Sequence, residues 1–475
     1  MFFGVAGVLS RVSGLITFPI LSRAMPVAEF GALDYLMTLS NLIAVFAIFG
    51  LESAAVRFFF ASDRSEDRFR ELSRVLSLQM RPVLLLVVSS IAAFSLAARD
   101  DLNVQMLAIG LVLAQSALMV PIAHFQYIMI WREQRRDYLF STVGQTILTV
   151  LVLIWACYGR SPSAVEVLTF LMVIRVVTFL HGYWATRRQF RLTLRPRGVS
   201  PILRYALPIG VVGTLAAFLP LIERQSILSF LTDADLGIYA AAARLGTLMT
   251  LPIAAFQLVW VPFALSHHRD PAAAVTYKAV LKLFTIASLA TALALAACAE
   301  PLLRILTTPE YAGARVAVFP ICLALVVKAI GDVVQVGIDI SRKSHLKLYA
   351  FAATTAASLV AAPLLTYSLG IVGAAWAAVL AYSVKAVLEY RLAQSAHRME
   401  WEAGRVLAIT LIAGAVGLMA QFAGETHAGV AALTLLLGCV LIALVGYRLT
   451  LDDEERAQLW SLVGFGKTAD REKQA

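Results

Sequence analysis

Long apolar runs alternate with short polar segments along almost the whole chain. Each run is about as long as a helix must be to cross the hydrocarbon core of a bilayer, roughly 20 residues. We therefore predict an all-α polytopic membrane protein with about fourteen transmembrane helices. The runs lie at approximately 2–22, 34–60, 80–98, 104–131, 139–158, 165–186, 205–230, 237–264, 278–299, 315–338, 348–368, 371–393, 405–423 and 429–449. The boundary between the two runs on either side of Gly370 is the least distinct.

Basic residues concentrate in alternate loops, which predicts the orientation of the chain. Lys and Arg are retained on the cytoplasmic side of a membrane. The loops that carry them contain Arg64, Arg68, Arg70 and Arg74; Arg132, Arg135 and Arg136; Arg187, Arg188, Arg191, Arg195 and Arg197; and Arg342, Lys343 and Lys347. The loops between them carry few bases, so we predict that both termini are cytoplasmic.

An internal repeat suggests how the helices are grouped. The segment Ile20–Tyr35, ILSRAMPVAEFGALDY, resembles Ile227–Ala240, ILSFLTDADLGIYA. Two six-helix lobes related as parallel repeats would account for this, and such lobes can rock about a central cavity. The predicted parts are an N-terminal lobe at 1–190, a basic linker at 191–204, a C-terminal lobe at 205–395, two accessory spans at 405–449 and a cytoplasmic tail at 450–475.

Composition agrees with the membrane assignment. The 475-residue chain is 60% hydrophobic and 15% charged, with a mean hydropathy of +0.79. Its formal net charge of +10 is explained by basic cytoplasmic loops, so we expect no nucleic-acid partner. The first apolar run has no basic residues ahead of it and contains Arg11, unlike a secretory signal, so we expect it to stay in the mature chain. The cysteines lack metal-type spacing and are expected to pack as small hydrophobic residues: Cys157, Cys298, Cys322 and Cys439.

The most distinct polar pattern lies in the tenth predicted helix. Lys328, Asp332, Gln335 and Asp339 recur at steps of four, three and four, which places them on one helix face. One interpretation is a local pair in which Lys328 neutralises Asp332. The other is a transport pathway, since ionisable residues inside membranes usually line pathways or relays.

Other ionisable residues also lie inside predicted spans, and their balance is positive. Arg11 lies on a face of small residues, and Glu52 in the next helix is its candidate partner. The candidate substrate-binding bases are Arg11, Arg175, Arg224, Arg244 and Lys328, and the acids that face them are Glu52, Glu223 and Asp332. A positive cavity favours an anionic substrate, and the planar guanidinium group matches phosphate oxygens. By contrast, Lys385 and Glu389 are interpreted as a structural pair.

Sequence motifs for catalysis are missing. The chain has no Walker-type glycine motif, no metal-type histidine spacing and no nucleophile with a matched base. We therefore expect no enzymatic activity, no cofactor and no bound metal.

Several segments resemble oligosaccharide and polysaccharide flippases, the Wzx-like members of the superfamily that also holds multidrug and toxic-compound extruders and lipid II flippases. The likeness rests on SRVSGLITFPILSRAMPVAEFGALDYL, GLESAAVRFF, LPIGVVGTLAAFLPLIERQSILSFLTDADLGIYAAAARLGTL and WVPFAL. It covers most of the first twelve predicted spans, although each motif is loose.

The resemblance implies a function. Such proteins pass an undecaprenyl-diphosphate-linked saccharide from the inner to the outer leaflet of the bacterial cytoplasmic membrane, for surface polysaccharide biosynthesis. The family's cavity arginines match Arg11, Arg224 and Arg244 here, although family members often have Asp-Arg where this chain has Glu223-Arg224. Family members also begin with a short basic segment, so we expect the natural start to lie upstream. In the lipid II flippases, helices past the twelfth form a lipid groove, which 405–449 would match.

Alternatives remain open. Glu52, Glu223, Asp332 or Asp339 could couple transport to H⁺ or Na⁺, and the chain could be a cation-coupled multidrug exporter of the same superfamily. A membrane polysaccharide polymerase or glycosyltransferase is a third choice, disfavoured by short loops, and a non-transporting scaffold is a fourth. For a flippase, the expected partners are membrane lipids, glycosyltransferases and a polymerase.

Overall fold

The computed structural model describes residues 14–61, 65–99, 103–193, 198–270, 273–426 and 428–446, and every regular element in these ranges is helical. Eleven of the described helical stretches are long and apolar enough to cross a membrane, and two shorter apolar helices are Gly14–Ala24 and Gly429–Val445. Each predicted apolar run is helical over most of its described residues, with short interruptions in some. The prediction of an all-α polytopic membrane protein is confirmed.

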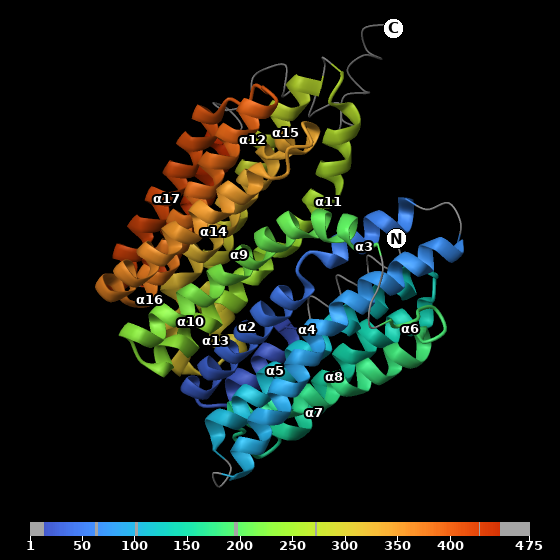
Figure 1. Ribbon diagram of the computed structural model, residues 1–475. Helices are drawn as coiled ribbons and strands as arrows, with labels where there is room; N and C mark the ends of the chain where they lie inside the picture. The colour runs from blue at the N-terminus through green and yellow to red at the C-terminus, as the bar shows by residue number, and fades with distance from the viewer. Residues whose placement is uncertain are drawn as a thin grey trace, which may run out of the picture. The chain divides into compact units, whose positions relative to one another are not determined.

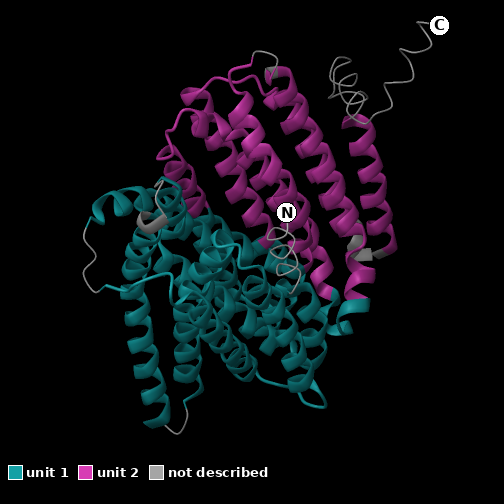
Figure 2. Ribbon diagram, turned by 90° about the vertical axis from the view of Figure 1, so that its right-hand side faces the viewer, with its two compact units in different colours: residues 1–244, 305–312, 358–374 teal, residues 245–304, 313–357, 375–475 magenta. Residues whose placement is uncertain are grey.

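The helices form two compact units, which Figure 2 colours separately. Unit 1 comprises 1–244, 305–312 and 358–374, and unit 2 comprises 245–304, 313–357 and 375–475. These units group the helices by packing, whereas the predicted lobes group them by repeat, and the lobe boundaries stay a prediction.

Unit 1 is built mainly from the described elements up to α10, which Figure 1 shows in blue to green. After the helix Gly14–Ala24 come α2 (Val27–Ile48), α3 (Leu51–Ala61), α4 (Ser65–Arg99), α5 (Val104–Trp131), α6 (Arg135–Leu139), the π-helical η1 (Phe140–Gly144), α7 (Gln145–Cys157), α8 (Ala164–Thr186), α9 (Ser200–Phe230) and α10 (Asp233–Gly246).

A long antiparallel hairpin of α4 and α5 supports unit 1. The Asn103 side chain accepts hydrogen bonds from the first free N–H groups of α5 and so begins that helix. Near the same end, the Ser90 hydroxyl donates to the carbonyl of Gly110 at 2.8 Å, across the two helices. α5 also packs against α2 and α8, which places it at the centre of the unit.

The second predicted span is divided into α2 and α3 by two residues with positive φ. Phe49 has φ 44° and Gly50 has φ 71°, so the helix stops and restarts there. A Cβ atom at Gly50 would lie 2.5 Å from the carbonyl oxygen of Ala206 in α9. Glycine is therefore required at this position both for its backbone angles and for the close approach of α9.

Two more glycines allow α2 and α10 to cross at backbone contact. A Cβ atom at Gly237 would lie 2.0 Å from the carbonyl oxygen of Val27, and one at Gly31 would lie 2.6 Å from the backbone nitrogen of Gly237. Gly31 and Gly237 occupy matching positions in the internal repeat noted above. The two copies of the repeat therefore meet at their shared small residue, a packing mode typical of membrane helices.

Unit 2 contains most of the remaining elements, in yellow-green to red in Figure 1. They are η2 (Thr247–Met249), α11 (Thr250–His267), α12 (Ala273–Ala297), α13 (Ala299–Leu306), η3 (Pro309–Ala314), α14 (Arg315–Val334), α15 (Val336–Ile340), α16 (Leu346–Ala396), α17 (Ala403–Thr426) and α18 (Ala428–Val445). Within α16, Gly370 leaves helical geometry with φ 64° and ψ −145°, which marks the break expected there between two spans.

The accessory helices α17 and α18 pack against α12. The linker ahead of α17 is held by α12, where Lys278 pairs with Glu400 and the fully buried Lys282 ammonium lies 3.0 Å from a carboxylate oxygen of Glu402. The hydrogen bond from Lys278 holds the pKa of the Glu400 carboxyl below its usual value. Trp401, also in the linker, is buried among aromatic rings of the unit.

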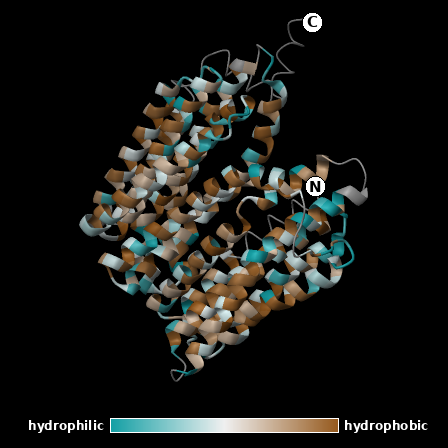
Figure 3. Ribbon diagram, viewed as in Figure 1, coloured by the Kyte–Doolittle hydropathy of each residue, from teal (hydrophilic) through white to brown (hydrophobic). Residues whose placement is uncertain are grey.

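Apolar side chains remain exposed on the outer faces of the described helices. Leu85, Val360, Leu411 and Leu437 are each more than half exposed. Hydrophobic residues dominate the middles of the helices and hydrophilic ones gather at helix ends and loops, as Figure 3 shows. A bilayer supplies the apolar surroundings that such surfaces need, and the protein is a multi-pass membrane protein.

Candidate functional site

One carboxylate, Asp34 of α2, joins two of the predicted cavity arginines. Arg224 of α9 donates its Nε–H to Asp34 Oδ2 at 2.7 Å, and Arg244 of α10 donates from Nη2 to Asp34 Oδ1 at 3.3 Å. The Asp34 side chain is only 7% exposed and that of Arg224 only 9%. The two guanidinium groups therefore share a single buried negative charge, since each oxygen of the carboxylate serves a different arginine.

The neighbouring acid, Glu223, contacts Tyr239 more closely than it contacts Arg224. Tyr239 donates its hydroxyl to Glu223 Oε2 at 2.7 Å, while the nearest guanidinium nitrogen of Arg224 lies 4.0 Å away. Arg224 also donates to the carbonyl of Pro220, one turn earlier in α9. The Glu223-Arg224 pair thus keeps an acid beside the arginine, but Asp34 is the carboxylate that Arg224 contacts closely.

The glycine crossing of α2 and α10 explains how this cluster forms. Gly31 lies one turn before Asp34, and Gly237 lies two turns before Arg244. Because the two helix backbones touch at these glycines, the side chains that follow on the same faces are brought together.

A cavity of about 320 Å³ lies beside this cluster, within unit 1. Its polar lining includes Thr17, Asp34, Gln145, Thr149, Arg175 and Arg244, and the remaining wall is apolar or glycine. A Cβ atom at Gly14 would lie 3.4 Å from Arg244 Nη1, so the small residue leaves room for the guanidinium group. The volume lies within the usual range of ligand sites and could hold roughly ten water molecules.

Arg175 of α8 gives this cavity its surplus positive charge. Among the described residues it makes no ion pair, and it lines the cavity together with Arg244 and Asp34. A half-buried guanidinium inside a membrane span is costly unless it binds an anion. The cavity therefore has room, a partly polar wall and an arginine available to an anionic ligand.

A second charged cluster lies in unit 2 around Asp332. Lys328 Nζ lies 2.7 Å from Asp332 Oδ2, and Lys385 Nζ lies 2.8 Å from Asp332 Oδ1. Lys385 also lies 2.6 Å from Glu389 Oε2, and both of these side chains are fully buried. The structure thus contains both local pairs expected from sequence and adds the link between them.

The predicted polar stripe crosses a one-residue interruption before Asp339, at which Gln335 keeps right-handed helical backbone angles of φ −63° and ψ −11°. α14 ends at Val334, and Gln335 separates it from the short α15. Asp339 then pairs with Lys347 at 2.7 Å, apart from the Asp332 cluster.

The remaining candidates have separate surroundings. Arg11 lies outside the described residues, as does any pairing of it with Glu52. Glu52 Oε2 accepts a weak hydrogen bond from the Tyr127 hydroxyl at 3.5 Å. Of the candidate bases, the structure brings Arg175, Arg224 and Arg244 together in unit 1, and Lys328 lies in the unit 2 cluster.

Asp34 is the functional candidate that sequence reasoning missed. It lies two helical turns after Pro26, past the first turn in which acids are favoured, and no second charged residue lies at helical spacing from it within α2. The available signal was its position within an apolar span and inside the repeated segment, beside Gly31.

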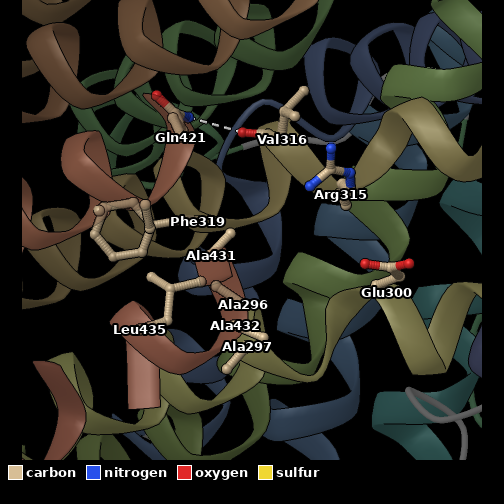
Figure 4. Close-up of a pocket in the computed structure, with 12 residues that line it drawn as sticks. Ala296, Ala297, Glu300, Arg315, Val316, Phe319, Gln421, Ala431, Ala432 and Leu435 are labelled. Carbon is tan, nitrogen blue, oxygen red and sulfur yellow. Dashed lines mark hydrogen bonds between the residues drawn. The ribbon is translucent and has the colours of Figure 1, made fainter. Parts of the chain in front are cut away.

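A further cavity, of about 50 Å³, lies in unit 2 (Figure 4). Figure 4 shows Gln421 donating to the carbonyl of Val316, with Arg315 and Glu300 at one side. This cavity has room for one or two water molecules rather than for a ligand head group.

Comparison with known proteins places this architecture in a family. The family model described as "Polysaccharide biosynthesis protein" matches residues 1–268, more than half of the chain. The chain belongs to the polysaccharide biosynthesis protein family. This confirms the relationship suggested by the sequence motifs, and the match contains Asp34, Arg175, Arg224 and Arg244 of the unit 1 site.

Solved structures show the fold of this family member. The lipid II flippase MurJ in an inward closed conformation superposes with a TM-score of 0.69 at 14% identity, covering 94% of this chain and 98% of that chain. An inward-facing multidrug resistance MATE family transporter of the MOP superfamily gives a TM-score of 0.60 at 15% identity, covering 81% and 94%. A MATE chain in complex with MaD3S gives 0.55 at 16% identity, covering 83% and 93%. The fold is therefore MATE-like, as predicted. No curated protein sequence matches the chain.

Proposed function

We propose that this protein is a flippase that moves an undecaprenyl-diphosphate-linked oligosaccharide from the inner to the outer leaflet of the bacterial cytoplasmic membrane. The observation that carries the proposal is the unit 1 cavity, which Arg175 and Arg244 line and to which, among the described residues, Asp34 alone contributes a carboxylate. Membership of the polysaccharide biosynthesis family supports the substrate class.

The chemistry of the cavity suits a diphosphate. Arg175 is open to an anion, and Arg244 contacts Asp34 only at 3.3 Å with a side chain that is 26% exposed. Paired phosphate oxygens could accept from both guanidinium groups in the bidentate manner that arginine favours. The Asp34–Arg224 bond, at 2.7 Å, would hold the cluster together during this exchange.

The rest of the proposal follows the sequence. Arg11 precedes the cavity residue Gly14 by three positions in the sequence, and we propose that it joins this cavity. The sugars would occupy polar space and the prenyl chain would stay in lipid, while alternating access moves the head group. Both termini would be cytoplasmic, H⁺ or Na⁺ could drive the cycle, and glycosyltransferases and a polymerase would supply and use the substrate. No step of this cycle needs covalent chemistry by the protein.

The test is neutralisation of the cavity arginines. Arg175→Gln and Arg244→Gln should abolish export of the lipid-linked oligosaccharide, because each removes a phosphate donor. The measurement is surface polysaccharide in cells, together with outward movement of a labelled lipid-linked oligosaccharide in proteoliposomes. Arg188→Gln, at an exposed arginine outside the spans, is the matched control and should export normally.

Protein level in the membrane separates loss of function from loss of folding. Normal export by both cavity variants at normal protein level would reject the proposal. Intact polysaccharide after deletion of the gene, with new sensitivity to drugs, would instead identify a multidrug exporter.

A further inference from the structure

Glu389, in α16, has one carboxylate oxygen that accepts a hydrogen bond and one that accepts none from the described residues. Its side chain is fully buried, and Oε2 accepts from Lys385 Nζ at 2.6 Å. Oε1 is buried as well, and no donor among the described residues reaches it. A buried carboxylate charge is costly where an oxygen has no donor, and proton binding at this oxygen removes that charge.

In the other carboxylate of the cluster, that of Asp332, both oxygens accept hydrogen bonds. Asp332 Oδ1 accepts from Lys385 at 2.8 Å, while Oδ2 accepts from Lys328 at 2.7 Å and from Gln257 at 3.2 Å. A proton added to either oxygen of Asp332 would displace a donor. A proton added to Glu389 Oε1 displaces none, which distinguishes the two acids by geometry alone.

The surroundings of Glu389 are otherwise tightly packed. A Cβ atom at Gly331 would lie 2.5 Å from Glu389 Oε2, so α14 comes close on that side. Lys385 Nζ lies over the ring of Phe351, in the first part of α16, at 5.0 Å from the ring centroid. The elements around Glu389 carry further charged groups. Lys328 and Asp332 of α14 and Lys385 of α16 belong to the cluster, Lys347 of α16 is paired with Asp339 of α15, and the others are Arg315 of α14 and Arg391 of α16.

We propose that Glu389 is a proton-binding site of unit 2 and that its protonation makes Lys328 available to an anion. The proton comes from bulk water and forms an O–H bond at Oε1. Glu389 then no longer carries the charge that held Lys385, so Lys385 is drawn fully to Asp332. Asp332 consequently holds Lys328 less strongly, because two ammonium groups now share one carboxylate.

Lys328 is the base of the cluster that is exposed enough to contact an anion. Its side chain is 35% exposed, whereas those of Lys385 and Glu389 are fully buried. Proton binding at Glu389 and anion binding at Lys328 would therefore favour one another, and this coupling is reciprocal. Its use in transport rests on the proposed function, since an anionic substrate is needed, but the proton site itself does not.

The experiment begins without any substrate. Infrared difference spectra of the full chain in lipid, recorded as pH is lowered, should show the C=O stretching band of a buried carboxylic acid. The band should be lost in Glu389→Gln and retained in Asp332→Asn. Absence of a titrating band in the native chain, or its survival in Glu389→Gln, would overturn the proposal.

Glu389→Asp covers the case in which the glutamine variant does not fold. It keeps a carboxyl group but withdraws it from Lys385, so the band should appear at a different pH. An unchanged titration in this variant would place the proton elsewhere and overturn the assignment.

The coupling is then tested with inorganic sulfate, whose charge does not change over this pH range. Sulfate affinity should rise as the band appears, and the rise should be lost in Glu389→Gln and in Lys328→Gln. Lys328→Gln should keep the infrared band, which makes it the matched control. A pH-dependent rise that survives in Lys328→Gln would refute the coupling. Because neither measurement uses the lipid-linked saccharide, both results stand apart from success or failure of the proposed transport.

Discussion

Each unit of this protein buries a cluster of charged side chains, and the clusters differ in how their charges balance. In unit 1, Arg224 and Arg244 share Asp34, and Arg175 adds a further positive charge beside an open cavity. In unit 2, Lys328 and Lys385 face Asp332 and Glu389 at direct contact, with the same number of charges of each sign.

The difference in charge balance distinguishes a cluster that attracts an anionic ligand from one that is neutral when no ligand is bound. A buried cluster with equal charges is neutral without a ligand until it takes up a proton, whereas a surplus of guanidinium groups beside a cavity is stabilised when an anion enters. Charge in a membrane span is therefore informative only when its partners are known.

Removing Asp34 should have the largest effect on the comparison. Asp34→Asn leaves Arg224 buried without its close carboxylate, which we expect to lower the free energy of unfolding by about 3–5 kcal/mol. The measurement is chemical unfolding in detergent. Asp233→Asn, at an exposed aspartate in the first turn of α10, is the control and should change stability by less than about 1 kcal/mol. Equal stability of the two variants would show that Asp34 does not hold the cluster.

Gly237→Ala should have an intermediate effect, because it separates the helices that position Asp34. The added methyl group would overlap the carbonyl oxygen of Val27, so α2 and α10 must move apart. We expect a loss of about 1–3 kcal/mol in the free energy of unfolding. Gly404→Ala is the matched control, since a Cβ atom there meets nothing within 4 Å. A Gly237→Ala protein as stable as this control would contradict the close crossing.

Replacing the balanced pair of unit 2 should have the smallest effect. The double variant Lys385→Met with Glu389→Leu removes both partners and leaves Asp332 with Lys328. Apolar residues of similar volume are often neutral or stabilising in place of a buried ion pair, so we expect no loss beyond about 1 kcal/mol. Chemical unfolding of this variant beside Lys385→Met alone is the measurement. A double variant as unstable as the single one would show that Lys385 stabilises the unit mainly through Asp332 rather than through Glu389.

Local charge pairs could be predicted from sequence, but contacts between distant segments could not. Lys328 with Asp332, and Lys385 with Glu389, lie four residues apart on their helices, and spacing alone brings such pairs together. The link from Asp332 to Lys385 joins residues 53 apart, and the bond from Arg224 to Asp34 joins residues 190 apart. No periodic pattern in the sequence predicts either of these two contacts. The pairing of Asp339 with Lys347, eight residues away and across a turn, is likewise a contact that the stripe pattern did not contain.

The sequence alone determined which segments are membrane helices and that the chain breaks at Gly370, because span length, apolar character and backbone freedom are local properties. It also determined that arginines would be buried in those helices. The tertiary structure decided which of them are neutralised, because two glycine backbones touch where α2 crosses α10 and bring Asp34 against Arg224 and Arg244. Charge balance at a buried site depends on which helices meet, and that is a property of the packed molecule rather than of any one segment.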